Sequence, residues 1–117
     1  MARSLIMFAL TLGLAACGGE GSGKTTILHL STDPEGALEF EEESLRAPAG
    51  EVTIELTNDA PIPHDVSVEG NGIEESSPTA ITSRAALTVE LEPGIYTFFC
   101  SVANHREAGM EGTLTIE

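Results

Sequence analysis

The chain has 117 residues with 19 acidic and 5 basic side chains, so its formal net charge is −14 at neutral pH. Nucleic acid is excluded as a partner, because a phosphate backbone calls for a basic surface. The charge would steer the protein toward basic partners, although acidic side chains also keep a small protein soluble. The length suits a single domain, and the sequence contains no internal repeat.

Residues 1–16 resemble an export signal. Arg3 supplies the charged start, and the apolar run of residues 5–16 is shorter than the roughly 20 residues that a membrane span needs. The run ends in LAAC at residues 14–17, which resembles the lipobox of bacterial lipoproteins. We therefore expect removal of the signal, lipidation of Cys17, and an exported protein anchored by lipid to the periplasmic or extracytoplasmic face of a membrane. The alternative is an ordinary secretory signal with an incidental cysteine.

Residues 17–25 are rich in glycine and are expected to form a flexible tether before the folded domain. Residues 18–25 also match the phosphate-binding pattern GxxxxGK[ST], but such a loop must follow a strand and open a helix. Here a lipidation site precedes the pattern and a strand-like segment, residues 26–30, follows it. The nucleotide-binding interpretation is therefore rejected.

Residues 26–117 carry short runs of alternating apolar side chains separated by turn residues, with no long segment of helical period. This pattern predicts one all-β domain built as a two-sheet sandwich. Residues 38–41 also alternate, and we interpret them as a solvated strand edge in preference to an acidic docking patch. Residues 70–83 are predicted to be a long connection. The predicted inward positions are Val52, Ile54, Leu56, Val66, Val68, Leu87, Val89, Leu91, Tyr96, Phe98, Cys100, Leu114 and Ile116.

Cysteine usage points to a metal site. With Cys17 committed to lipid, Cys100 has no disulfide partner, and an unpaired thiol outside the cytoplasm needs protection. His105 follows Cys100 by five residues and Met110 follows His105 by five, which places a thiolate, an imidazole and a thioether on one loop. Soft sulfur with imidazole selects copper or zinc, and two imidazoles with a thiolate and a weak axial thioether are typical of an electron-transfer copper site.

The second imidazole has few candidates, because the chain has three histidines. His64 follows the predicted strand of residues 52–57, in a loop that two prolines stiffen before any metal arrives. His29 lies inside a predicted strand with no sulfur or second imidazole nearby, so we expect it to be a surface or edge-strand residue. His64 is thus selected partly by elimination.

The pattern YxFxCx4Hx4M at residues 96–110, with an upstream Pro-His pair and LxPG before the tyrosine, resembles the cupredoxins, blue copper proteins of the plastocyanin and azurin type. The resemblance covers residues 26–117. It implies a Greek-key β-sandwich with one copper ion at one end, held by His64, Cys100, His105 and Met110. It also implies a one-electron carrier between redox proteins such as cytochromes or membrane oxidoreductase complexes, with His105 as the exposed imidazole through which electrons leave.

The chain departs from the family in two ways. Family members usually carry asparagine after the first histidine, where it ties the two ligand loops together, and this chain has Asp65. Asp65 can accept the same backbone hydrogen bonds, and its charge is expected to favour Cu(II) and lower the reduction potential. The spacing from Cys100 to His105 matches azurin while that to Met110 is plastocyanin-like, a mixture that resembles auracyanin-type proteins and leaves the subfamily open.

Other functions are compatible with parts of this pattern. A copper chaperone or storage lipoprotein would transfer the ion instead of electrons, and a metal-free adhesion or scaffold sandwich would use Cys100 and Met110 as core residues and His105 as an ordinary loop residue. Catalysis is not expected, because four protein ligands leave no open position for a substrate.

Overall fold

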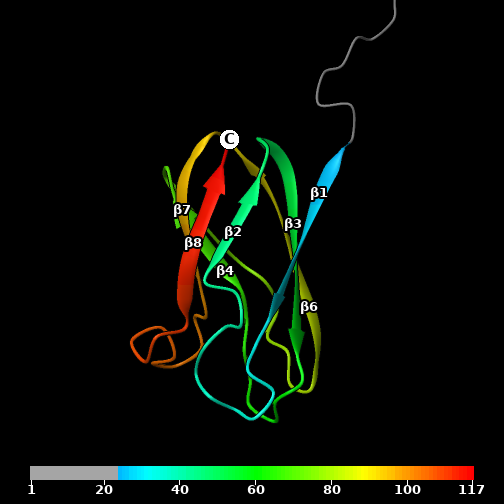
Figure 1. Ribbon diagram of the computed structural model, residues 1–117, viewed down its shortest axis with the longest axis vertical. Coiled ribbons are helices and arrows are strands. Elements are labelled where there is room, and N and C mark those ends of the chain that lie inside the picture. The colour runs from blue at the N-terminus through cyan, green and yellow to red at the C-terminus, as the bar shows by residue number, and fades with distance from the viewer. Residues whose placement is uncertain (1–23) are drawn as a thin grey trace, which may run out of the picture.

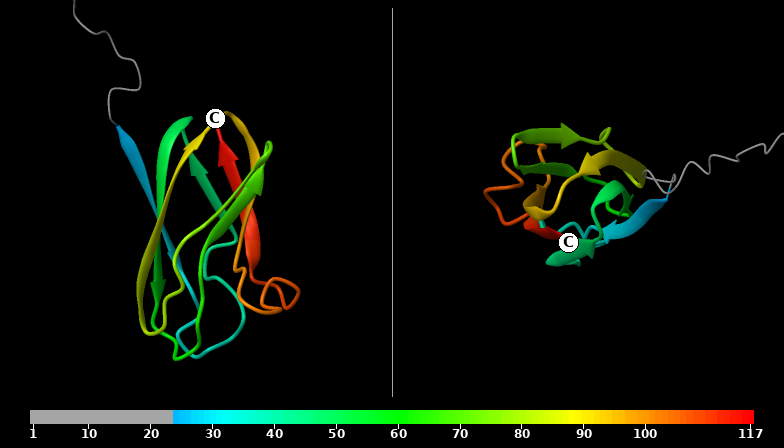
Figure 2. Two further views of the ribbon diagram at one scale, coloured as in Figure 1. Left: turned by 180° about the vertical axis from the view of Figure 1, so that it is seen from behind. Right: turned by 90° about the horizontal axis from the view of Figure 1, so that it is seen from above.

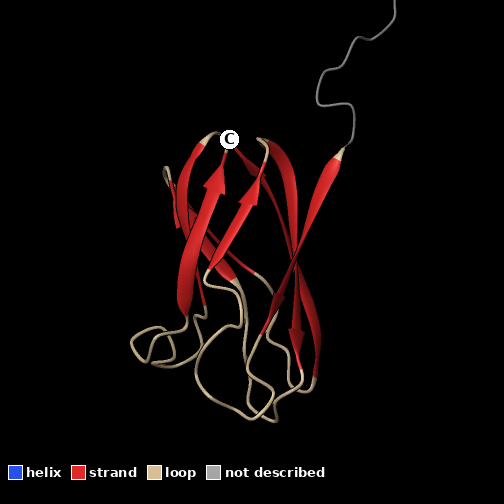
Figure 3. Ribbon diagram, in the orientation of Figure 1, coloured by secondary structure: helices blue, strands red, loops and turns tan. Residues whose placement is uncertain are grey.

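The computed structural model describes residues 24–117, all strands, turns and loops with no helix in that range (Figure 3). The predicted signal, Cys17 and the tether up to residue 23 lie outside the described residues. The first sheet has the order β1-β3-β6, with β1 at Thr25–Ser31, β3 at Gly50–Asn58 and β6 at Ser83–Leu91. The second has the order β2-β8-β7-β4-β5, with β2 at Ser44–Ala47, β8 at Glu111–Ile116, β7 at Gly94–Phe99, β4 at Ser67–Gly70 and β5 at Ile73–Ser76.

The two sheets pack face to face, and the chain crosses repeatedly from one to the other (Figures 1 and 2). β1 runs parallel to β3, whereas β6 is antiparallel to β3 and β7 is antiparallel to β8. This confirms the two-sheet sandwich that the alternation predicts, with the Greek-key arrangement that the cupredoxin resemblance implies. Since no helix occurs in residues 24–117, this part of the chain contains none that is long and apolar enough to cross a membrane.

The core lies between the sheets and consists of the side chains that the alternation placed inward. All thirteen predicted inward residues are buried. Phe40 adds a further ring from the loop between β1 and β2, packed edge-on against Phe98 with 5.5 Å between ring centroids. Burial of a large apolar side chain contributes roughly 1.5–3 kcal/mol, so this continuous cluster is what holds the two sheets together.

Two local predictions are wrong. Residues 70–83 are not one long connection, because β4 turns back into β5 through Asn71 and Gly72, both with positive φ. Asn-Gly is the pair that favours such a two-residue hairpin, so the signal was present in the sequence. Residues 38–41 do not form a strand, because only Phe40 pairs, through an isolated bridge with Thr32. The flanking glutamates are nevertheless exposed, as the alternation predicts.

The loops that carry the predicted ligands lie at one end of the sandwich. Residues 59–66, 77–82 and 100–110 gather there together with the loop of residues 32–43, at the lower end of Figure 1. The C-terminus lies at the opposite end. β1 begins at Thr25, one residue before the predicted domain boundary, and pairs there with the first residues of β3. The first residues of the described chain are therefore far from the ligand loops.

Gly112 allows β8 to lie close to Phe98 of β7. A Cβ atom at position 112 would lie 2.2 Å from Cζ of Phe98 and 2.6 Å from the carbonyl oxygen of Glu43. We predict that Gly112→Ala lowers the free energy of unfolding by about 1–3 kcal/mol, because overpacking forces core and backbone to shift. Urea unfolding measures the loss. The exposed neighbour Thr113→Ala is the control and should lose less than about 1 kcal/mol. Equal losses in the two variants would contradict the prediction.

Candidate metal centre

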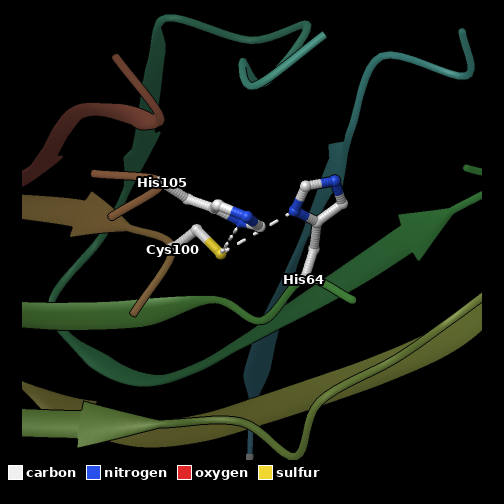
Figure 4. A group of neighbouring side chains, drawn as sticks. All are labelled: His64, Cys100 and His105. Atoms are coloured by element: carbon white, nitrogen blue, oxygen red, sulfur yellow. Dashed lines mark hydrogen bonds between the residues drawn. The ribbon is translucent and has the colours of Figure 1, made fainter. Parts of the chain in front are cut away.

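Three of the four predicted ligands meet at this end of the sandwich. Nδ1 of His64 lies 3.8 Å from Sγ of Cys100, and Nδ1 of His105 lies 3.6 Å from the same sulfur. Figure 4 shows both rings directing this nitrogen toward the sulfur. The three donor atoms all lie within 4.8 Å of one another, and all three side chains are buried. His64 and Cys100 are 36 residues apart, so only the folded sandwich brings them together.

Met110 joins this group through its backbone. The N–H of Cys100 donates to the carbonyl of Met110 at 3.1 Å, and the N–H of Met110 donates to the carbonyl of His105 at 3.1 Å. These bonds close the loop of residues 100–110, and the Met110 side chain is fully buried. Its role as an axial ligand stays a prediction.

The loop between Cys100 and His105 is held in an uncommon conformation. Ala103 has a φ of 44°, a left-handed value that is rare for residues other than glycine. It allows the N–H of His105 to donate to the carbonyl of Val102 at 3.0 Å. Such strained residues persist only where the surroundings enforce them, and they concentrate at functional sites.

Burial sets the protonation of the donors when no metal is bound. Burial raises the pKa of the Cys100 thiol, and the backbone amides of Asp65 and Val102 only partly oppose this effect. Burial also lowers the pKa of His64, and the neighbouring His105 ring lowers it further. At neutral pH the thiol is therefore protonated and the His64 ring is neutral. A metal ion would find the imidazole ready and would displace one proton from the thiol.

Asp65 connects the two ligand loops. It is 4% exposed, and its carboxylate accepts hydrogen bonds from the Ser101 N–H at 2.7 Å and from the Ser101 hydroxyl. Asp65 follows His64 and Ser101 follows Cys100, so this contact fixes the distance between the two ligands' backbones. The sequence predicted the backbone hydrogen bond but not the hydroxyl contact.

Contacts of Arg106 hold the ligand loop next to His105. The Arg106 guanidinium lies over the Phe99 ring, 4.1 Å from its centroid, and forms ion pairs with Glu69 and, at 3.1 Å, with Glu111. These carboxylates, Glu69 first, raise the pKa of Arg106. No sequence pattern indicates this cluster, because its members come from four separate positions along the chain.

Two further expectations concern the histidines. His105 was expected to be exposed, but it is only 8% exposed. Of the two imidazoles it is still the one with solvent access, since His64 has none. His29 lies on the outer face of β1, 3.4 Å from Glu55 with 77% of its side chain exposed, which agrees with the surface role expected for it.

The donor set fits a single metal ion. An ion such as zinc lies about 2.3 Å from a thiolate sulfur and about 2.0–2.1 Å from an imidazole nitrogen. With about 110–120° between these bonds, sulfur and nitrogen lie about 3.6–3.8 Å apart. The separations of 3.8 and 3.6 Å from Cys100 to the two imidazoles match this value. Nδ1 is the nitrogen of His64 that is placed to bind, because it faces the Cys100 sulfur, while Nε2 is buried with no hydrogen-bond partner among residues 24–117.

The donor types alone allow copper or zinc, and comparison with protein families decides in favour of copper. A family model described as copper-binding proteins of the plastocyanin/azurin family matches residues 28–117. The chain belongs to this family. As a cupredoxin it binds one copper ion, and His64, Cys100 and His105 are placed to hold it. A comparison with curated proteins finds no match.

Solved cupredoxin structures share the fold at low sequence identity. Auracyanin B is 19% identical with a TM-score of 0.70, over 79% of this cupredoxin and 88% of that chain. The reduced auracyanin of Roseiflexus castenholzii is 18% identical with a TM-score of 0.70, over 81% and 99%. Auracyanin A of Chloroflexus aurantiacus, described as a "blue" copper protein, is 18% identical with a TM-score of 0.69, over 80% and 100%. At these identities the likeness shows the fold.

The buried carboxylate beside the copper site predicts a change in reduction potential. We predict that Asp65→Asn raises the potential, because it removes a negative charge that favours Cu(II) over Cu(I) while an amide oxygen can still accept the Ser101 N–H. Redox titration of the copper-loaded protein measures the shift. Glu107→Gln, an exposed change of the same charge on the ligand loop, is the control and should shift the potential less, because water screens that site. An unchanged or lower potential in Asp65→Asn would rule this effect out.

Proposed function

We propose that the protein is a type 1 copper protein that carries single electrons, with His64, Cys100 and His105 as strong ligands and Met110 as the weak axial ligand. The observation that carries the proposal is the buried convergence of two imidazoles on one thiol, in a chain of the plastocyanin/azurin family. Copper supplies the change between Cu(II) and Cu(I) in such a site.

The surroundings of the donors favour an electron carrier over a protein that transfers the ion. Cys100 and His64 are fully buried, and His105 is 8% exposed, so an acceptor protein has little access to the donor atoms. Hydrogen bonds from both ends of the ligand loop and from Asp65 hold the donors in place. Donors that do not move give a site that rearranges little when the electron moves, and transfer is then fast. Since four protein ligands leave no open position, the same arrangement does not favour catalysis.

His105 is the group through which the electron would leave, because its ring is the one with solvent access at the copper end. Acidic side chains line a hollow that includes Arg106, the residue after His105. Glu39, Glu42, Glu43 and Glu111 line this hollow of about 590 Å³ together with the salt-bridged Arg106. This charge supports docking of redox partners with basic surfaces, such as cytochromes or membrane oxidoreductase complexes.

We propose further that the protein is exported and lipid-anchored through Cys17, which would restrict it to a membrane surface where its redox partners lie. The export signal and the LAAC sequence at residues 14–17 support this proposal.

The copper assignment predicts a specific spectrum. The domain of residues 24–117, loaded with Cu(II), should show an intense blue absorption and a narrow copper hyperfine splitting in its electron paramagnetic resonance spectrum. Cys100→Ser should abolish the blue colour, because the absorption arises from the thiolate. His29→Ala is the control and should leave the spectrum unchanged, since that ring lies on the outer face of β1. A colourless or pale wild-type protein would exclude a type 1 site.

Two measurements separate the finer parts of this assignment. Met110→Leu should keep the blue colour but raise the reduction potential, because the axial thioether is a donor that tunes the potential. The reduced protein should react rapidly with an oxidised cytochrome and keep its copper through repeated cycles. Rapid loss of Cu(I) to an acceptor protein would favour the chaperone or storage function instead.

The anchor predicts a change in partitioning. When the full chain is expressed in a bacterium, the protein should partition into the detergent phase of Triton X-114, and Cys17→Ala should move it to the aqueous phase, since lipidation requires the thiol. Metabolic labelling with a fatty acid should label the wild-type protein and should not label the Cys17→Ala variant. Labelled protein from the Cys17→Ala variant would contradict lipidation at this residue.

A further inference from the structure

Asn58, the last residue of β3, is fully buried and all the hydrogen-bonding positions of its side-chain amide are used. Its Nδ2 donates to the carbonyls of Ile62 at 2.7 Å and Ala80 at 2.8 Å. Its Oδ1 accepts from the Ala60 N–H at 3.0 Å and from the Thr32 hydroxyl at 3.0 Å. An amide offers two donors and two acceptor positions, so Asn58 joins three separate segments of the chain through one satisfied group.

Two of these segments hold His64. The backbone of His64 pairs with that of Ala80 in both directions, at 3.0 Å from the His64 N–H to the Ala80 carbonyl and at 2.8 Å in return. The Ala80 carbonyl therefore accepts from His64 and Asn58 together. Asn58 also fixes Ala60 and Ile62, which lie in the loop that leads into His64. The Asn58 amide therefore contacts the loop that leads into His64 and also Ala80, the residue whose backbone pairs with that of His64.

Thr82 closes the same arrangement from the other side. Its N–H and its hydroxyl both donate to the carbonyl of Ala60, each at 3.2 Å. Thr82 has a φ of 47°, a left-handed conformation that is a genuine outlier for a β-branched residue. The strain indicates that the surrounding contacts determine the path of residues 80–82, and these contacts converge on the loop that carries His64.

We propose that Asn58 is a positioning residue that holds the backbone of His64 in its copper-binding place before the ion arrives. This inference rests on the proposed role of His64 as a ligand. No side chain of similar size replaces the amide, because aspartate has no donor for the two carbonyls and leucine has neither donor nor acceptor. The prolines at positions 61 and 63 stiffen the loop, but Pro61 is exposed, and the hydrogen bonds of Asn58 connect that loop to the rest of the core. A ligand held in advance lowers the ordering cost of metal binding and limits movement in the redox step.

The test compares Asn58→Ala with Leu91→Ala. Leu91 is a buried core residue at the end of β6 that pairs with Gly50, away from the ligand loops, so its variant lowers stability without touching the copper end. Thr32→Val is a milder variant that removes one of the four hydrogen bonds of Asn58, and it keeps the test informative should Asn58→Ala fold poorly.

The first measurement uses the copper-free protein. In each variant, the exchange rates of the His64 and Ala80 amides are divided by the rate of amides in the centre of β3, which corrects for a general loss of stability. This ratio should be at least roughly tenfold larger in Asn58→Ala than in Leu91→Ala. Thr32→Val should change the same two amides in the same direction by a smaller factor. Equal exchange of these amides in Asn58→Ala and Leu91→Ala would overturn the proposal.

The second measurement uses the copper-loaded protein. Asn58→Ala should bind Cu(II) more slowly and give a broadened copper hyperfine pattern, because His64 then samples several positions, whereas Leu91→Ala should give the wild-type pattern. An unchanged pattern and rate in Asn58→Ala would also overturn the proposal. A wild-type protein without a blue spectrum would instead refute the proposed function, and the exchange experiment would then decide by itself whether Asn58 holds the loop.

Discussion

The buried thiol of Cys100 imposes the strongest physical demand on this molecule. Burial raises its pKa, so the thiolate forms only when a positive ion takes the place of the proton, and both imidazole nitrogens must be in reach when that happens. The sandwich meets this demand at its edge. β7 ends directly before Cys100, and the closing hydrogen bonds between Cys100, His105 and Met110 return the chain to β8. The metal centre is therefore continuous with the core, and the apolar cluster that stabilises the fold also excludes water from the donors.

Two buried polar side chains adapt this apolar end to its function. Asp65 ties the His64 segment to the Cys100 segment, and Asn58 ties the His64 segment to the first sheet and to residues 80–82. Asp65 accepts the Ser101 N–H, and Asn58 accepts the Ala60 N–H, a buried group that would be costly to leave unpaired inside a protein. They differ in charge, and that difference separates their effects. The neutral amide acts through geometry alone, whereas the carboxylate acts through geometry and through its electrostatic field.

The sequence predicted the parts of this structure that depend on short-range patterns. Alternation has a period of two residues, so every predicted inward side chain, from Val52 to Ile116, is buried. Cys100, His105 and Met110 share one loop, and their spacing is visible in the chain itself. His64 was selected partly by elimination among three histidines and partly by its place in a proline-stiffened loop after a predicted strand. In contrast, β2 and β5 were missed, since strands of only four residues carry a weak pattern. The contacts of Asn58 with Ala80 and of Arg106 with Glu69 join residues 22 and 37 positions apart, and their formation depends on how the sheets pack.

The direction of β1 places the start of the described chain at the end of the sandwich opposite the metal centre. β1 runs parallel to β3, so Thr25 lies beside the start of β3 while the donors lie beyond the end of that strand. Any anchor upstream of Thr25 therefore holds the molecule by the end opposite its redox centre. In a membrane-tethered chain with this geometry, the copper end would lie farthest from the point of attachment. A soluble partner would then reach the copper end without first contacting the lipid surface. The tether predicted for residues 17–25 would add to the distance between that surface and the redox centre.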